Sequence, residues 1–143
     1  MTSMTPVPSR NFALMNPPGL YEPSANGYSH LAMVGGGSRL VFVAGQGGET
    51  ADGALSSDFR KQVRQAMKNL ALALNAAGAA PQHVAKLTVL IVDHSEERLH
   101  VFGEELACVF GTGLKPACTL IPVPRLALAG MLFEIEGVAV LPA

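Results

Sequence analysis

The sequence predicts a mixed α/β (α+β) domain in which two amphipathic helices cover one face of a β-sheet. Strand-like and helical patterns follow one another in the order β-β-α-β-α-β-β. The 143 residues suit one domain, and their 49% hydrophobic content is high for a monomer whose whole surface faces water. The strand-like runs are apolar on both faces, so we expect the uncovered sheet face to pack against other copies of the chain.

The composition argues against some classes of binding partner. Only 15% of the residues are charged and the formal net charge is -1, which gives no electrostatic case for binding nucleic acid or a membrane surface. No apolar run reaches the roughly 18 residues that span a bilayer, and no secretory signal pattern precedes the domain. Cys108 and Cys118 form no CxxC motif and are interpreted as reduced thiols of a cytoplasmic protein. The four histidines lack metal-ligand spacing, so we predict no metal and no other cofactor.

Residues 1–26 are expected to form an extended arm ahead of a folded domain over residues 27–143. Prolines exclude regular structure over most of the arm. They are Pro6, Pro8, Pro17, Pro18 and Pro23. The arm either closes over a site, lies on a neighbouring subunit or hangs free.

Residues 28–34 and 40–44 predict two strands joined by a glycine-rich turn at 35–38, and hence a β-hairpin. Residues 45–48 form a second glycine-rich stretch directly after the hairpin. It lacks the GxxxxGK[ST] pattern and no helix follows at once, so we expect a tight, backbone-exposing loop rather than a P-loop, and such a loop is able to line a ligand site.

The first helix is predicted from Ser56-Ser57-Asp58, which supplies N-cap chemistry, to Gly78, which ends it. Its apolar stripe is Phe59, Val63, Ala66, Met67, Leu70 and Leu74. Its opposite face carries a basic ridge of Arg60, Lys61, Arg64 and Lys68. Because no aromatic platform accompanies the ridge, a solvated helix face is favoured over an RNA contact.

A third strand is predicted over residues 85–92, and Asp93 or Ser95 is expected to cap a second helix. The apolar stripe of that helix is Leu99, Phe102, Leu106, Val109 and Phe110. Two closing strands, 116–123 and 131–141, are joined by a loop. Glu134 and Glu136 lie two apart in the last strand and therefore share one face. Carboxylates in an apolar strand are costly unless partnered, so Glu134 is either an acid–base group or a structural anchor, and Glu136 is interpreted as structural.

Pro116-Ala117-x-Thr119 and the run from Phe133 to Ala139 resemble the RidA family, also called YjgF. The pair Gly45-Gln46, the run Lys86-Leu87-Thr88-Val89 and Ala77-Gly78 extend the resemblance from about residue 27 to the C-terminus. It implies a chorismate-mutase-like fold and a homotrimer with a small-molecule cleft at each subunit interface. Characterised members hydrolyse enamine or imine acids to 2-keto acids and ammonia.

The resemblance also assigns candidate site residues by position. Glu134 corresponds to the family's catalytic glutamate, Tyr28 to a pocket tyrosine, Gly45 to a glycine at the strand end, and Leu120 to a pocket-lining position. In deaminating members an arginine that follows the Pro-Ala pair holds the substrate carboxylate. Cys118 stands at that position here. A serine and an asparagine of the family pocket are likewise replaced, by Ala44 and Val101.

Cys118 is either an inert pocket-lining residue or a nucleophile, although no sequence-local base is evident. Arg125 is a solvated loop residue, a trimer contact or a replacement for the missing arginine. The sequence thus favours a trimeric small-molecule-binding protein of altered specificity without typical deaminase activity. The alternatives are a working enamine/imine deaminase and a non-catalytic interaction scaffold.

Overall fold

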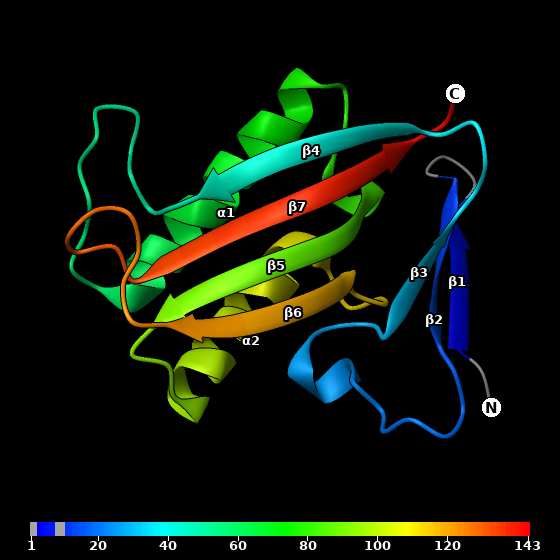
Figure 1. Ribbon diagram of the computed structural model, residues 1–143, viewed down its shortest axis with the longest axis horizontal. Helices are drawn as coiled ribbons and strands as arrows, with labels where there is room; N and C mark the ends of the chain where they lie inside the picture. Colours follow the sequence, from blue (N-terminus) through cyan, green and yellow to red (C-terminus); the bar gives the residue numbers. More distant parts are fainter. Residues whose placement is uncertain (1–2, 8–10) are drawn as a thin grey trace.

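The fold consists of two sheets and two helices in a computed structural model that describes residues 3–7 and 11–143. The main sheet contains β4 (Arg39–Gln46), β5 (Val84–Val92), β6 (Ala117–Val123) and β7 (Phe133–Leu141), in the spatial order β4-β7-β5-β6. Helices α1 (Phe59–Ala76) and α2 (Glu96–Phe110) lie behind this sheet in Figure 1. A smaller sheet contains β1 (Ser3–Val7), β2 (Phe12–Asn16) and β3 (Leu31–Val34), and it stands at one end of the main sheet. Two 3-10 turns complete the elements, η1 (Ser24–Asn26) and η2 (Pro81–His83).

Both predicted helices are confirmed together with their caps. The Asp58 carboxylate accepts a hydrogen bond from the backbone N–H of Lys61 at 2.9 Å, and the Ser95 hydroxyl accepts one from Arg98 N–H at 3.1 Å. These bonds satisfy backbone donors that have no partner inside the helix. Gly78 follows α1 with a φ of 76°, a left-handed conformation that glycine adopts without strain. The predicted apolar stripe of α1 is buried, and Gln62 is buried with it.

The register of the main sheet fixes which residues meet the helices. β7 pairs antiparallel with β4 and β5, whereas β5 and β6 run parallel. Alternate residues of β5 and β7 pack beneath α1 and α2. They are Leu87, Val89, Ile91, Phe133 and Ile135, all with 0% exposure. Phe102 of α2 contacts Phe133 at a ring-centroid distance of 5.7 Å, so the sheet and both helices share one core.

The predicted hairpin between residues 28–34 and 40–44 is wrong. Both strands exist, but β3 pairs with β2 and β4 pairs with β7. The turn at 35–38 therefore passes the chain from the small sheet to the main sheet. β2 provides a partner for β3 because its alternate residues Phe12 and Leu14 pack on Ala85 and Val140 of the main sheet. A local turn pattern cannot reveal this long-range pairing.

The expectation that residues 1–26 lack regular structure is also corrected. Residues 3–7 and 12–16 form strands of the small sheet, and Pro8 lies outside the described residues. Pro6 is compatible with β1 because that strand is at the edge, where a missing N–H breaks no inner ladder. The two prolines at 17 and 18 come immediately after β2, where they end it.

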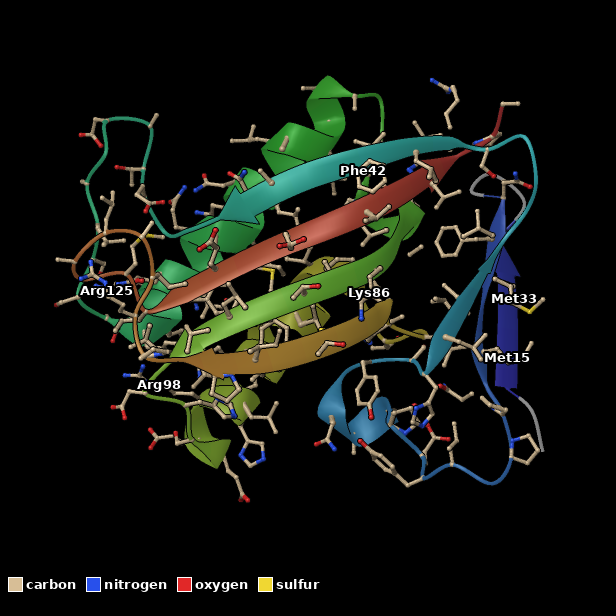
Figure 2. All side chains as sticks on the ribbon, viewed as in Figure 1. Met15, Met33, Phe42, Lys86, Arg98 and Arg125 are labelled. Carbon is tan, nitrogen blue, oxygen red and sulfur yellow. The ribbon has the colours of Figure 1, made fainter. Side chains whose placement is uncertain are left out.

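The face of the main sheet opposite the helices is uncovered and partly apolar. Phe42, Leu40 and Ile121 expose 74%, 51% and 43% of their surface there. Figure 2 is viewed onto this face, with Phe42 and Lys86 labelled. We call it the open face. Among the described residues, none of the helices is long and apolar enough to cross a membrane.

Candidate functional site

A cavity of about 510 Å³ lies along the edge strand β6. Its walls come from the segment 26–30, the start of β6 and helix α2. The segment is held there because Ser29 N–H donates to the Pro116 carbonyl at 3.1 Å and Ser29 forms a parallel bridge with Ala117. The residues that line it include Tyr28, Ser29, His30, Lys86, Leu99, Phe102, Cys118, Thr119 and Leu120. The cavity therefore brings together three predicted site residues, Tyr28, Cys118 and Leu120.

Tyr28 belongs to a cluster of three rings at the cavity. The hydroxyls of Tyr28 and Tyr21 are hydrogen-bonded, and the His30 ring is edge-on to both tyrosines at centroid distances of 5.5 Å. His30 Nε2 lies 2.8 Å from the Tyr21 carbonyl oxygen, which can only accept, so Nε2 carries the proton. The hydrogen bond between Tyr28 and Tyr21, with a smaller effect of burial, raises the pKa of Tyr28 to about 12. Tyr28 is therefore a protonated polar contact near neutral pH and not a base.

Cys118 is a neutral thiol in the cavity wall. It packs against the core beneath the helices, and burial raises its pKa to about 11, an effect that the Lys86 ammonium opposes. Since the thiolate is the nucleophilic form, this environment disfavours a nucleophilic role. An uncharged thiol also cannot replace a guanidinium as an anion-binding group.

Glu134 lies against Gly45. A Cβ atom built on Gly45 would approach Glu134 Oε1 to 1.9 Å, so any larger residue at 45 would displace the carboxylate. The two predicted residues are therefore in direct contact across β7 and β4. Within the described part of the chain, ion pairs involve only Arg60 and Arg64, so Glu134 and Glu136 have no salt-bridge partner there.

The candidate residues form two groups on opposite faces of the sheet. Cys118 is opposite Leu87, which faces the helices, whereas Glu134 is opposite Leu90, on the open face. A single chain thus presents Tyr28, Cys118 and Leu120 as one group, and Gly45 with Glu134 as the other. A site that uses both groups requires the open face of a second copy beside the cavity of the first.

Arg125 lies apart from the cavity in the loop between β6 and β7. Its Nε donates to the Leu126 carbonyl at 3.1 Å. Figure 2 places Arg125 at the end of the sheet opposite the end where Lys86 lies. Arg125 therefore does not reach the Cys118 group within one chain.

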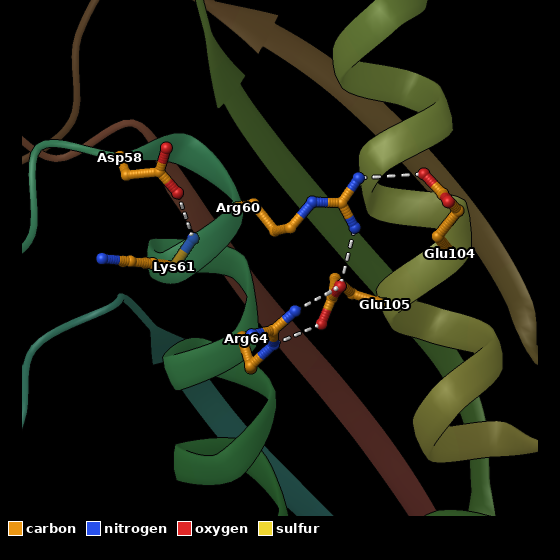
Figure 3. Close-up of polar contacts among 6 residues, drawn as sticks. All are labelled: Asp58, Arg60, Lys61, Arg64, Glu104 and Glu105. Carbon is orange, nitrogen blue, oxygen red and sulfur yellow. Dashed lines mark hydrogen bonds and ion pairs between the residues drawn. The ribbon is translucent and has the colours of Figure 1, made fainter.

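The basic ridge of α1 is half neutralised by α2. Arg64 forms two hydrogen bonds with the Glu105 carboxylate at 2.9 and 3.1 Å, and Arg60 bridges Glu105 at 2.8 Å and Glu104 at 3.0 Å (Figure 3). The Arg64 hydrogen bonds, followed by those of Arg60, hold the pKa of Glu105 below its ordinary value despite burial. These arginines join the two helices.

Four further residues line or support the site, although no sequence pattern marked them as functional. Ser29, His30 and Lys86 line the cavity, and Gln62 ties α1 to the loop before β7. Gln62 was detectable in principle, because it interrupts the buried apolar stripe of α1. The described residues contain no group of three or more His, Cys, Asp or Glu side chains placed to share a metal ion.

The fold and the two groups of site residues agree with one known protein family. Residues 20–141 match the family model described as Endoribonuclease L-PSP. The chain belongs to this family, which includes the RidA/YjgF proteins.

Three relatives illustrate the similarity. The RutC family protein YjgH of Escherichia coli K12 is 35% identical over 106 residues, which cover 72% of this chain and 76% of YjgH. The structure of YyfB from Yersinia pestis, a Rid protein described as of unknown function, superposes with a TM-score of 0.86. Its identity is 32%, and the match covers 92% of this chain and 99% of YyfB. Escherichia coli TdcF, solved with bound serine, gives a TM-score of 0.65 at 28% identity, covering 86% of this chain and 91% of TdcF.

Proposed function

We propose that the protein is a homotrimeric small-molecule-binding member of the RidA/YjgF family with altered ligand specificity and without typical deaminase activity. The observation that supports this proposal is the neutral, half-buried thiol of Cys118, which stands where the resemblance places the family's carboxylate-binding arginine. Deaminating members need that guanidinium to hold and orient the substrate acid. A thiol supplies neither the charge nor the bidentate geometry.

The trimer is supported by the open face. Phe42, Leu40 and Ile121 expose apolar surface that a second copy would bury. The division of site residues between the two sheet faces supports the same assembly, since the cleft needs the Glu134 group of one copy and the Cys118 group of another.

An enamine/imine deaminase is the second candidate, and the contact between Glu134 and Gly45 favours it. In that reaction water adds to the imine carbon and ammonia leaves, giving a 2-keto acid. Glu134 would position the water and transfer protons, as the resemblance implies. Arg125 of a neighbouring copy would then have to supply the carboxylate contact.

A role in binding or cutting RNA, which the family description names, has less support. Two of the four cations of the α1 ridge, Arg60 and Arg64, are engaged by Glu104 and Glu105. The ridge therefore offers little net positive charge to a phosphate backbone.

Incubation with enzymatically generated 2-iminobutanoate tests the proposal. We expect 2-ketobutyrate to form no faster than by spontaneous hydrolysis, and Cys118→Arg to raise the rate by restoring the missing cation. Rapid turnover by the wild-type protein would contradict the proposal. If Arg125→Ala then abolished that turnover, the deaminase candidate would be correct.

A further inference from the structure

The open face of the main sheet carries charged side chains of both signs beside its apolar residues. Leu87 of β5 is buried beneath the helices, so its neighbour Lys86 lies on the open face. By the same alternation Glu136 of β7, which follows the buried Ile135, also lies there. Lys86 is half-buried and Glu136 is exposed. Neither forms a salt bridge within the described part of the chain.

The two charges are kept apart within one chain. Glu136 is opposite Thr88, and Thr88 is opposite Thr119, so these three side chains form one row across β7, β5 and β6. The Lys86 ammonium donates to Thr119 Oγ1 at 2.9 Å, at the far end of that row. Adjacent strands are about 4.8 Å apart, so the cation and the carboxylate are separated by about 10 Å. The ammonium group has three donors, so two remain for an acceptor outside the chain.

Apolar surface lies next to both charges. Phe42 of β4 is 74% exposed and is opposite Val138, which is in turn opposite Lys86 (Figure 2). A partner that covers this apolar surface also removes water from Lys86 and Glu136. Loss of water is strongly unfavourable for a charge that gains no opposite charge in exchange. The partner must therefore supply a carboxylate for Lys86 and a cation for Glu136.

A second copy of the chain meets both requirements. Its open face carries the same two charges at the same separation, so a copy displaced across the sheet places its Glu136 against Lys86 of the first. A partner with charges of one sign would leave one of the two groups unpaired. Head-to-tail contacts of this kind repeat from copy to copy and generate a ring when the rotation closes.

We propose that an ion pair between Lys86 of one copy and Glu136 of the next fixes how the open faces meet. This inference rests on the proposed function, because it names the residues by which the copies of the homotrimer recognise one another. It gives a role to Glu136, which the cleft does not use. Such a pair determines the register and the choice of partner more than the affinity, since its attraction largely offsets the lost hydration.

Charge reversal tests the pair by sedimentation equilibrium over a series of protomer concentrations. We expect Lys86→Glu and Glu136→Lys each to weaken association about a hundredfold, because each places two like charges in contact. The double variant, Lys86→Glu with Glu136→Lys, restores opposite charges and should associate within about threefold of the wild type.

Matched variants separate the pair from general charge effects. Lys61→Glu and Glu97→Lys make the same reversals at exposed positions of α1 and α2 and should leave association unchanged. Far-UV circular dichroism shows whether each variant is folded. Where a reversal prevents folding, Lys86→Met and Glu136→Gln take its place. Each should weaken association about tenfold, and the two together should weaken it no more than either alone.

The possible outcomes are distinct. A trimeric wild type whose double reversal associates no better than the single reversals would overturn the ion pair and leave the homotrimer intact. Additive losses in the neutral variants, or equal losses in the control variants, would do the same. Rescue of Lys86→Glu by Glu134→Lys and not by Glu136→Lys would overturn the role of Glu136. A monomeric wild type would overturn the ion pair and the proposed assembly together.

Discussion

Gln62 is expected to be the polar residue whose loss most affects the stability of the site. Its side chain has 0% exposure in the stripe of α1 that faces the sheet. Nε2 donates to the carbonyls of Ser56 at 2.7 Å and Gly130 at 2.9 Å, and Oε1 accepts from Leu132 N–H at 2.8 Å. One amide thus joins the segment before α1, the helix itself and the loop that leads to Glu134.

Gln62→Leu keeps the size of the side chain and removes all three hydrogen bonds. Each contributes about 1 kcal/mol net, and the backbone groups left behind lose their partners, so we expect the free energy of unfolding to fall by about 2–4 kcal/mol. Gly130 is exposed and Ser56 is partly exposed, so water replaces some of the lost hydrogen bonds, which sets the lower end of that range. Gln65→Leu is the matched control, because Gln65 makes one side-chain bond, to Asn69 at 3.0 Å.

Urea unfolding of both variants at one protomer concentration measures the effect, since association would otherwise change the apparent stability. The midpoint should fall for Gln62→Leu with an unchanged slope, and hydrogen exchange at the Leu132 amide should accelerate. If Gln62→Leu loses no more stability than Gln65→Leu, the three hydrogen bonds do not hold the loop as described.

Three further predictions concern the open face, the thiols and the helix pair. Phe42→Asp should dissociate the oligomer in sedimentation experiments, whereas Leu72→Asp, at a site 68% exposed on α1, should not; equal behaviour would exclude the open face as the interface. With a thiol reagent at pH 8, Cys108 should react much faster than Cys118, because Cys118 is half-buried with a pKa of about 11; equal rates would contradict that environment. Folding lowers the pKa of Glu105 from its ordinary value of 4.5. Its ion pairs therefore stabilise the protein at pH values above that ordinary pKa, and this contribution is lost as the pH falls through the lower pKa of the folded state. Thermal melts should therefore show a steeper acid destabilisation for wild type than for Glu105→Gln, and parallel curves would contradict it.

Local patterns predicted the elements of the domain well. Asp58 and Ser95 were recognisable as helix caps, and the closing strands were evident from their apolar runs. These features depend on residues close together in the sequence. The pairing of strands does not, which is why the hairpin prediction failed and why β1 and β2 were missed behind their prolines.

The candidate site was predictable only in part. The resemblance selected Tyr28, Cys118 and Leu120, which meet at one cavity, and Gly45 and Glu134, which touch each other. It did not show that the two groups lie on opposite faces, since that follows from strand register. Ser29 and Lys86 can be recognised as cavity-lining residues only from the structure, because the fold brings together β5, β6 and the segment before β3.

The proposed function requires that the cleft is completed between copies of the chain. Sedimentation equilibrium at micromolar concentration tests it most directly. We predict a mass three times that of the 14.9 kDa chain. A monomeric mass would contradict the claim, because the Cys118 and Glu134 groups would then remain on opposite faces of one sheet with no second copy to join them.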